Sequence, residues 1–216
     1  GTVADSMGRL AQLAADLLSR GCGLPRDEAT GRYLGTAGDD FRTQLDVIAS
    51  GRPGLDEIAV RFEAAKEGLM GGIRPFADAG TAIEGLGHAD VPALVCSSTR
   101  TDLGQEFCLR FGLTQLADAV DGWRPDHPKV AQLRTWAAAI GVAPNDVLFV
   151  GDAVRDAAIA RAAGVRFVGL ARPGHPDAFA GSGVPVVTSL TDLARLVAGA
   201  RRSSLILPVN VPRFVE

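Results

Sequence analysis

The fold is decided by the stretch Val147-Leu148-Phe149-Val150-Gly151-Asp152-Ala153-Val154-Arg155-Asp156. Its first four residues are apolar and suit a buried strand, and a helical pattern begins just after Asp152. Similar apolar runs alternate with helical segments throughout the chain after residue 75. This alternation predicts an α/β protein with a parallel sheet covered by helices on both faces. Strands are expected at 91–96, 147–150, 165–170 and 184–187, and helices near 77–87, 102–112, 128–140, 153–163 and 190–199.

The chain before residue 75 has a different texture, because residues 5 to about 70 show only helical periodicity. Met7, Leu10 and Leu17 fall on one face of a helix, and Phe41 and Leu45 on one face of another. We expect four short helices here. The chain is therefore divided into residues 1–6, a helical unit over 7–72, an α/β core over 73–200 and a C-terminal tail over 201–216.

The composition of the 216-residue chain is that of an ordinary globular protein, with 47% hydrophobic residues, 22% charged residues and a net charge of -3. No apolar run approaches the ~18 residues of a membrane span, and no basic cluster suits nucleic acid. Three cysteines at unrelated spacings indicate neither a disulfide framework nor a zinc site. We therefore expect a small-molecule partner, no nucleic-acid or membrane partner, and a cytoplasmic location.

Polar side chains follow two of the expected strands. Ser97 and Ser98 follow the first one, whereas Asp152 follows the second, with Asp156 one helical turn further on. Ligands of open α/β sheets bind at the carboxyl ends of the strands, and two converging carboxylates suit Mg²⁺. The alternative is structural: Asp152 caps the helix, Asp156 is an acid favoured in its first turn, and the serines form a turn or cap.

Lysine is rare in this chain, which has Lys66 and Lys129 among 22 lysines and arginines. Lys129 follows Pro128 at an expected helix start, where the helix dipole disfavours a cation by ~0.3–1 kcal/mol. That local cost indicates a functional role, and the alternative is a solvated lysine. Lys66 shares a helix with apolar residues and is expected to be solvated.

The order of these groups resembles the haloacid dehalogenase superfamily, in particular its phosphoglycolate-phosphatase-like hydrolases with an α-helical cap. Gly1-Thr2-Val3-Ala4-Asp5-Ser6 is similar to the end of that family's first motif, Asp-x-Asp-Gly-Thr-(apolar)-x-Asp-Ser. Ser97 is similar to the second motif, Lys129 to the third, and Gly151-Asp152 with Asp156 to the fourth, Gly-Asp-x-x-x-Asp. The resemblance implies a Rossmann-like parallel sheet core with the helical unit as an inserted all-α cap domain.

The resemblance also implies an activity, the Mg²⁺-dependent hydrolysis of a small phosphorylated metabolite through an aspartyl-phosphate intermediate. It makes Asp152 and Asp156 the metal residues. Lys129, which pairs phosphate and nucleophile, and Ser97, which donates to a phosphate oxygen, become the catalytic residues. The substrate-binding residues that it implies are Gly1, Thr2, Ser98 and Lys129.

In that family the nucleophile and the acid/base are the two aspartates of the Asp-x-Asp, and both would precede Gly1. Asp5 cannot replace them, because it corresponds to the downstream Asp-Ser pair. We therefore expect the chain to be a fragment that binds metal and phosphate without turnover. The cap is expected to exclude water from the site, moving on hinges at Val3-Ala4 and Gly71-Gly72.

Three alternative functions follow from the same residues. A catalytically inactive binding or structural protein of this fold agrees with the missing Asp-x-Asp. A dehalogenase is disfavoured because its chemistry needs no metal, whereas Asp152 and Asp156 suit one. A phosphonatase needs a Schiff-base lysine in the cap, and Lys66 is the candidate, although its place on the last cap helix argues against that role.

Overall fold

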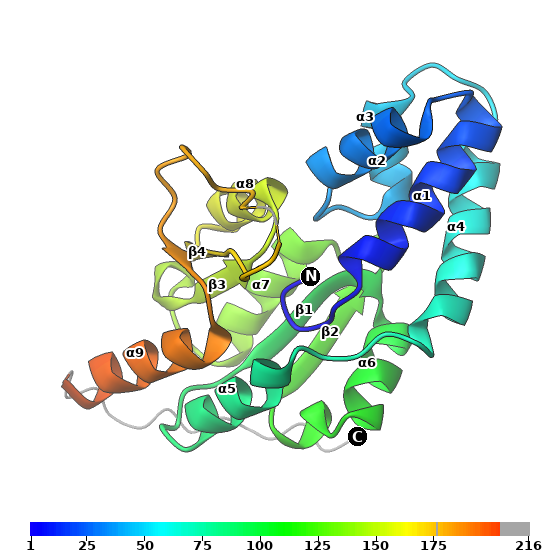
Figure 1. Ribbon diagram of the computed structural model, residues 1–216. Helices are drawn as coiled ribbons and strands as arrows, with labels where there is room; N and C mark the ends of the chain where they lie inside the picture. The colour runs from blue at the N-terminus through cyan, green and yellow to red at the C-terminus, as the bar shows by residue number, and fades with distance from the viewer. Residues whose placement is uncertain (176, 204–216) are drawn as a thin grey trace.

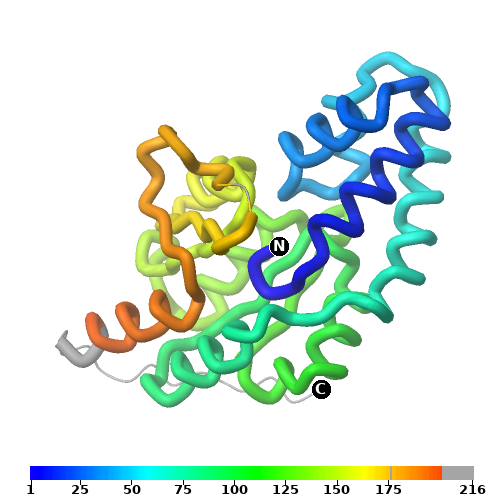
Figure 2. The backbone as a smooth tube through the Cα atoms, in the orientation of Figure 1, coloured from blue at the N-terminus to red at the C-terminus, as the bar shows by residue number. Residues whose placement is uncertain are grey.

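The computed structural model describes residues 1–175 and 177–203, which form a helical cap and an α/β core (Figure 1). The predicted fold class is confirmed. Helices α1 and α4 pack against each other and lead from the cap down to the core, as the tube in Figure 2 shows. The cap consists of the four expected helices, α1 (Met7–Cys22), α2 (Arg26–Gly35), α3 (Phe41–Ile48) and α4 (Leu55–Met70).

The apolar faces of the cap helices meet in one continuous core. Phe41 stacks on Phe62 with ring centroids 3.8 Å apart, and Tyr33 packs against both rings. Asp40 begins α3 by accepting a hydrogen bond from the Thr43 amide at 3.1 Å, which satisfies one of the free donors of the first turn. The cap is thus a helical unit with a core of its own.

The α/β core alternates strands and helices, and every strand pair in it is parallel, as the sequence predicted. The strands are β1 (Leu94–Arg100), β2 (Ala119–Trp123), β3 (Leu148–Gly151), β4 (Arg166–Leu170) and β5 (Val186–Val187). The helices are α5 (Ala77–Gly87), α6 (Thr101–Arg110), α7 (Lys129–Ala139), α8 (Val154–Ala163) and α9 (Leu190–Ser203), with 3₁₀ turns at Leu113–Gln115 and Pro144–Asp146.

The sheet of the described residues is divided in two, with β1 paired to β2 and β3-β4-β5 forming the other part. Among the described residues, the inner strands β1 and β3 therefore have a strand neighbour on one side only. Between them lies an apolar cavity of about 700 Å³, which we call the inter-sheet slot. It is lined by both strands and by helices α5, α7 and α9, with Val95, Leu133, Trp136, Phe149 and Leu193 among its residues.

Two expectations about the strands were wrong. Strand β2 was not expected, because Asp121 and Gly122 interrupt its apolar character. Gly122 packs so closely against the segment that begins the preceding helix at Thr101 that an added Cβ would lie 2.6 Å from the Thr101 nitrogen, which explains the glycine. The pairing with β2 also carries β1 on to Arg100, so that Ser97 and Ser98 lie inside the strand rather than after it.

Two connections join the cap to the core, and they pair with each other. The Asp5 amide donates to the Arg74 carbonyl, and the Phe76 amide donates to the Val3 carbonyl, both at 2.9 Å. The segment that enters α1 is thereby tied to the segment that leaves α4. The hinges and the boundaries of the cap at residues 7 and 72 stay predictions.

The predicted tail begins inside α9, and residues 204–216 lie outside the described part of the chain. None of the helices in the described ranges is long and apolar enough to cross a membrane.

Candidate active site

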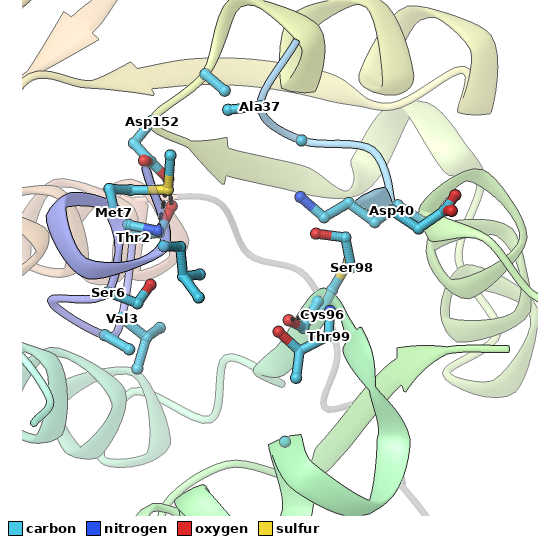
Figure 3. A pocket seen from close by; sticks show the side chains of 18 of the residues that line it. Thr2, Val3, Ser6, Met7, Ala37, Asp40, Cys96, Ser98, Thr99 and Asp152 are labelled. Carbon is cyan, nitrogen blue, oxygen red and sulfur yellow. Dashed lines mark hydrogen bonds and ion pairs between the residues drawn. The ribbon is translucent and has the colours of Figure 1, made fainter. Parts of the chain in front are cut away.

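A pocket of about 170 Å³, here called the rim pocket, lies where the carboxyl ends of β1 and β3 face the cap. In Figure 3, Thr2 and Asp152 lie on one side of it and Ser98 and Thr99 on the other. The fold brings together all the site residues that the sequence singled out. Gly1, Thr2, Ser97, Ser98, Lys129, Asp152 and Asp156 line this one pocket.

Lys129 and Asp156 form a buried ion pair in the core wall of the rim pocket. The Lys129 Nζ donates to the Asp156 Oδ1 at 2.7 Å, and the two side chains are 12% and 3% exposed. Burial disfavours the charge of Lys129, but the Asp156 carboxylate outweighs it and raises the pKa of Lys129 above its ordinary value. The alternative of a solvated lysine is wrong for Lys129. Its side chain is buried, paired with Asp156 and positively charged at neutral pH.

Asp156 has a second, structural role. Its Oδ2 accepts a hydrogen bond from the Ala153 amide at 3.3 Å, in the first turn of α8. This role agrees with the structural alternative for Asp156, and together with Lys129 it occupies both carboxylate oxygens. Asp156 therefore orders Lys129 and the start of α8.

Asp152 lies between β3 and α8 and is not the residue that caps the helix, since Ala153 occupies the N-cap position. Its Oδ1 accepts a hydrogen bond from the Thr2 hydroxyl at 2.8 Å, and the Gly1 amino group lies 3.3 Å away. Burial alone would raise the pKa of Asp152. In the chain that begins at Gly1, the Gly1 amino group, the Thr2 hydroxyl and Lys129 lower the pKa of Asp152 overall, so Asp152 is a carboxylate at neutral pH.

Thr2 is itself fixed from the loop after β4. The Arg172 guanidinium donates to the Thr2 carbonyl at 2.9 Å and forms an ion pair with Asp78 at 2.9 Å. It also lies 3.8 Å from the centre of the Phe76 ring. Sequence reasoning missed Arg172, because nothing local distinguishes it from the other arginines.

Ser97 is held by Gln132, a fully buried residue that sequence reasoning also missed. The Gln132 amide donates to the Ser97 carbonyl at 3.0 Å, and the Ser97 amide donates to the Gln132 Oε1 at 3.2 Å. The Ser97 hydroxyl accepts from the Thr99 amide at 3.0 Å and keeps its own hydrogen available for a ligand. Gln132 follows Lys129 by three residues on α7, so the two share a helix face.

The cap wall of the rim pocket combines aromatic rings with one cation. Phe41, Phe62, Tyr33 and Lys66 line it. Lys66 was expected to be solvated, and this is wrong, because it is only 5% exposed. Burial lowers the pKa of Lys66 below its ordinary value, and burial, followed by the charges of Glu63 and Asp152, raises the pKa of Tyr33.

The loop before α3 closes the cap onto the core. Asp39 forms an ion pair with Arg155 of α8 at 2.6 Å. Gly38 has φ 118°, and an added Cβ would lie 3.0 Å from the Arg155 Cβ, so only glycine suits this contact. The rim pocket is thus covered by the cap.

The chemistry of this pocket suits a small oxyanion beside a hard cation. Lys129 supplies positive charge, Ser97 and Ser98 supply hydroxyl donors, and Asp152 supplies one carboxylate that faces the pocket. The described residues contain no group of three or more His, Cys, Asp or Glu side chains that could hold a metal by themselves. Mg²⁺ commonly binds one or two carboxylates together with water and substrate phosphate, so Asp152 fits such a site as a partial ligand set.

The parallel sheet, the helical cap and the rim pocket define a capped protein with a Rossmann-like core. A family model described as "Haloacid dehalogenase-like hydrolase" matches residues 1–170. The chain belongs to this family. It matches none of the curated proteins compared with it.

Solved structures show the same fold at low sequence identity. A predicted phosphatase from Clostridium acetobutylicum is 16% identical, with 92% of this chain and 94% of that one covered and a TM-score of 0.75. A predicted phosphoglycolate phosphatase from Haemophilus somnus is 20% identical, with coverage of 91% and 94% and a TM-score of 0.67. A hydrolase of this family from Deinococcus radiodurans, solved with bound phosphate and sodium, is 24% identical, with coverage of 91% and 92% and a TM-score of 0.60.

Proposed function

We propose that this chain carries the phosphate- and metal-binding part of a Mg²⁺-dependent hydrolase of small phosphorylated metabolites. One observation carries the proposal: Lys129, Ser97 and Asp152 come from three separate elements and line the same capped pocket. Phosphoryl transfer depends on positioning and on neutralising the charge of the phosphoryl oxygens. The phosphate bound to the Deinococcus radiodurans relative agrees with this ligand.

Each residue has a role in this proposal. Lys129, kept charged and oriented by Asp156, pairs with a phosphate oxygen and with the nucleophile. Ser97, positioned by Gln132, donates its hydroxyl hydrogen to another oxygen, and Ser98 lines the same wall. The cap keeps bulk water away and selects the leaving group.

Asp152 is the proposed ligand of the metal, with Thr2 and Arg172 holding it in place. A bound Mg²⁺ would supply positive charge to the phosphate oxygens. Asp156, predicted as a second metal residue, takes the ordering role in this proposal because Lys129 and the Ala153 amide use both of its oxygens.

The nucleophile is proposed to lie on a strand in the inter-sheet slot, directly before Gly1. The carboxyl ends of both inner strands line the rim pocket, each strand lacks a strand neighbour on the slot side within the described residues, and the lining of the slot is apolar. Thr2 and Val3 line the slot as well as the rim pocket, so a strand leading into Gly1 would end at the phosphate site. Unpaired inner edges are unfavourable in a buried sheet, which supports this placement.

An Asp-x-Asp at the end of that strand completes the reaction. The first aspartate forms a bond to phosphorus as the ester oxygen leaves, and the second gives a proton to that oxygen. Water, deprotonated by the second aspartate, then attacks the aspartyl-phosphate and releases inorganic phosphate. Asp152, Asp156, Lys129 and Ser97 bind and orient in this scheme, and none of them attacks phosphorus.

Three polypeptides test this function. One is the 216-residue chain, the second has an added apolar strand of about five residues ending in Asp-x-Asp, and the third has the same strand ending in Asn-x-Asn. With p-nitrophenyl phosphate and Mg²⁺, we expect turnover from the Asp-x-Asp form alone, abolished by EDTA. Equal turnover by the Asn-x-Asn form would contradict the assignment of the nucleophile. Phosphate binding without turnover by the Asp-x-Asp form would favour the inactive binding protein.

A further inference from the structure

The two lysines of the chain line the rim pocket from opposite walls. Lys129 belongs to the core wall and Lys66 to helix α4 of the cap. No arginine lies among the described residues that line this pocket, although arginines make up most of the cations in the chain. The pocket thus has one lysine from the cap and one from the core.

The two lysines differ in how well they are paired. Lys129 has a short contact of 2.7 Å to a buried carboxylate, whereas the Lys66 Nζ lies 3.4 and 3.5 Å from the two oxygens of Glu63. Charge-assisted hydrogen bonds are normally about 2.7–2.9 Å long, and an ammonium group has three donors. Glu63, which is 30% exposed, therefore leaves Lys66 under-satisfied in a buried position where an unpaired charge is costly.

The surroundings of Lys66 indicate what kind of group could pair with its ammonium group. Phe62, with its ring centre 5.9 Å from the Lys66 Nζ, and the neighbouring Phe41 and Tyr33 form an aromatic wall that suits a short carbon chain. The other charges that act on Lys66 are Asp40 and Arg100, and Arg100 already pairs with Asp102 and Glu67. An anionic oxygen from a ligand would supply the partner that Glu63 provides only weakly.

We propose that Lys66 binds an anionic group, a carboxylate or a second phosphate, carried by the leaving group of the substrate. The inference rests on the proposed function, because it takes the scissile phosphate to be bound at Lys129. The rim pocket has a volume of about 170 Å³, which limits the spacer between the two anionic groups to a short one. Such a ligand spans both walls and holds the cap on the core.

Two phosphonates that differ only in their second group test this assignment by calorimetry on the 216-residue chain with Mg²⁺. Phosphonoacetate carries a carboxylate, and ethylphosphonate has a methyl group in its place. We expect phosphonoacetate to bind at least about tenfold more tightly, the factor that one charged hydrogen bond provides. Lys66→Met should abolish this preference, and Lys66→Arg should retain part of it.

Glu63→Gln is the matched variant with the opposite sign. Removing the competing carboxylate should strengthen phosphonoacetate binding and leave ethylphosphonate binding within about twofold. It also keeps the proposal testable if Lys66→Met does not fold.

Other outcomes would overturn the inference. They are equal binding of both phosphonates, or a preference that survives Lys66→Met. Reductive trapping of Lys66 by borohydride with an aldehyde-bearing phosphonate would assign this amine to Schiff-base chemistry instead. Binding of neither phosphonate would contradict the phosphate site itself, and thus the proposed function as well.

Discussion

The cap and the core of this protein bury their apolar residues in different ways. The cap buries its apolar residues in one continuous cluster built from four helices that follow each other in sequence. The apolar residues of the core form two separate clusters, one around β3 and α8 and the other around β1 and α6, on either side of the inter-sheet slot. Local helices complete the cap, whereas the core depends on contacts between distant segments.

The two buried lysines repeat this difference. Lys129 of the core is paired closely with Asp156, and its pKa is raised. Lys66 of the cap is paired loosely with Glu63, and burial lowers its pKa. A buried lysine that stabilises the fold and one that is proposed to bind a ligand should therefore differ in how their removal changes the free energy of unfolding.

The largest effect is expected from Lys129→Met, which leaves the Asp156 carboxylate buried and unpaired. Losing one partner of a buried ion pair costs about 3–5 kcal/mol, to be measured by urea unfolding. The double variant Lys129→Met, Asp156→Leu should recover only part of that loss, because it removes the unpaired carboxylate but also the acceptor of the Ala153 amide. Lys66→Met is the matched cap variant and should leave the free energy of unfolding unchanged or raised. Equal losses for both lysines would remove the distinction between them.

The pH dependence of unfolding should separate the two lysines further. A lysine whose folded pKa is lowered binds fewer protons in the folded state, so its contribution to stability rises with pH from the folded pKa up to about 10.5. A lysine whose folded pKa is raised stabilises fully below 10.5 and loses that effect as pH rises through the folded pKa. Comparing each methionine variant with the parent from pH 6 to 11 should give slopes of opposite sign. Slopes of one sign would contradict the assigned shifts.

A smaller effect is expected from Gln132→Leu. Its loss removes the bonds to both backbone groups of Ser97 and leaves buried polar groups unsatisfied, which costs about 1–3 kcal/mol. Orthophosphate affinity should fall as well, because Ser97 would be misplaced. Gln105→Leu, on the exposed face of α6, is the control that should alter neither thermal unfolding nor phosphate binding. A stability loss without any loss of phosphate affinity would make Gln132 purely structural.

Two glycines, one in the core and one in the cap, should respond to alanine with opposite signs. Gly122→Ala in the core places a Cβ 2.5 Å from the Thr101 Cα and should destabilise by about 1–3 kcal/mol. Gly68→Ala in α4 of the cap meets no atom within 4 Å and should stabilise by roughly 0.5–1 kcal/mol. Thermal unfolding of both variants would check these opposite signs, and a stable Gly122→Ala variant would show that β2 can move away from α6.

The sequence predicted the parts of this molecule that depend on local patterns. Periodicity located the cap helices, and the polar residues near the ends of β1 and β3 pointed to the rim pocket. Prediction from the sequence failed for features that depend on contacts with residues far away in the chain. Strand β2 forms because β1 lies beside it, and Gln132 matters because Ser97 lies opposite. Lys66 is buried in the rim pocket, whose lining includes Tyr33 and Phe41 of other cap helices.

The central claim is that the inter-sheet slot receives a strand that carries the nucleophile, and amide hydrogen exchange tests it most directly. We predict that the Asp-x-Asp extension slows exchange roughly tenfold or more along both β1 and β3, including Val95 and Phe149, relative to the 216-residue chain. Leu18 and the rest of α1 in the cap should exchange as before. Unchanged exchange along β1 and β3, with an extension that exchanges freely, would contradict the account.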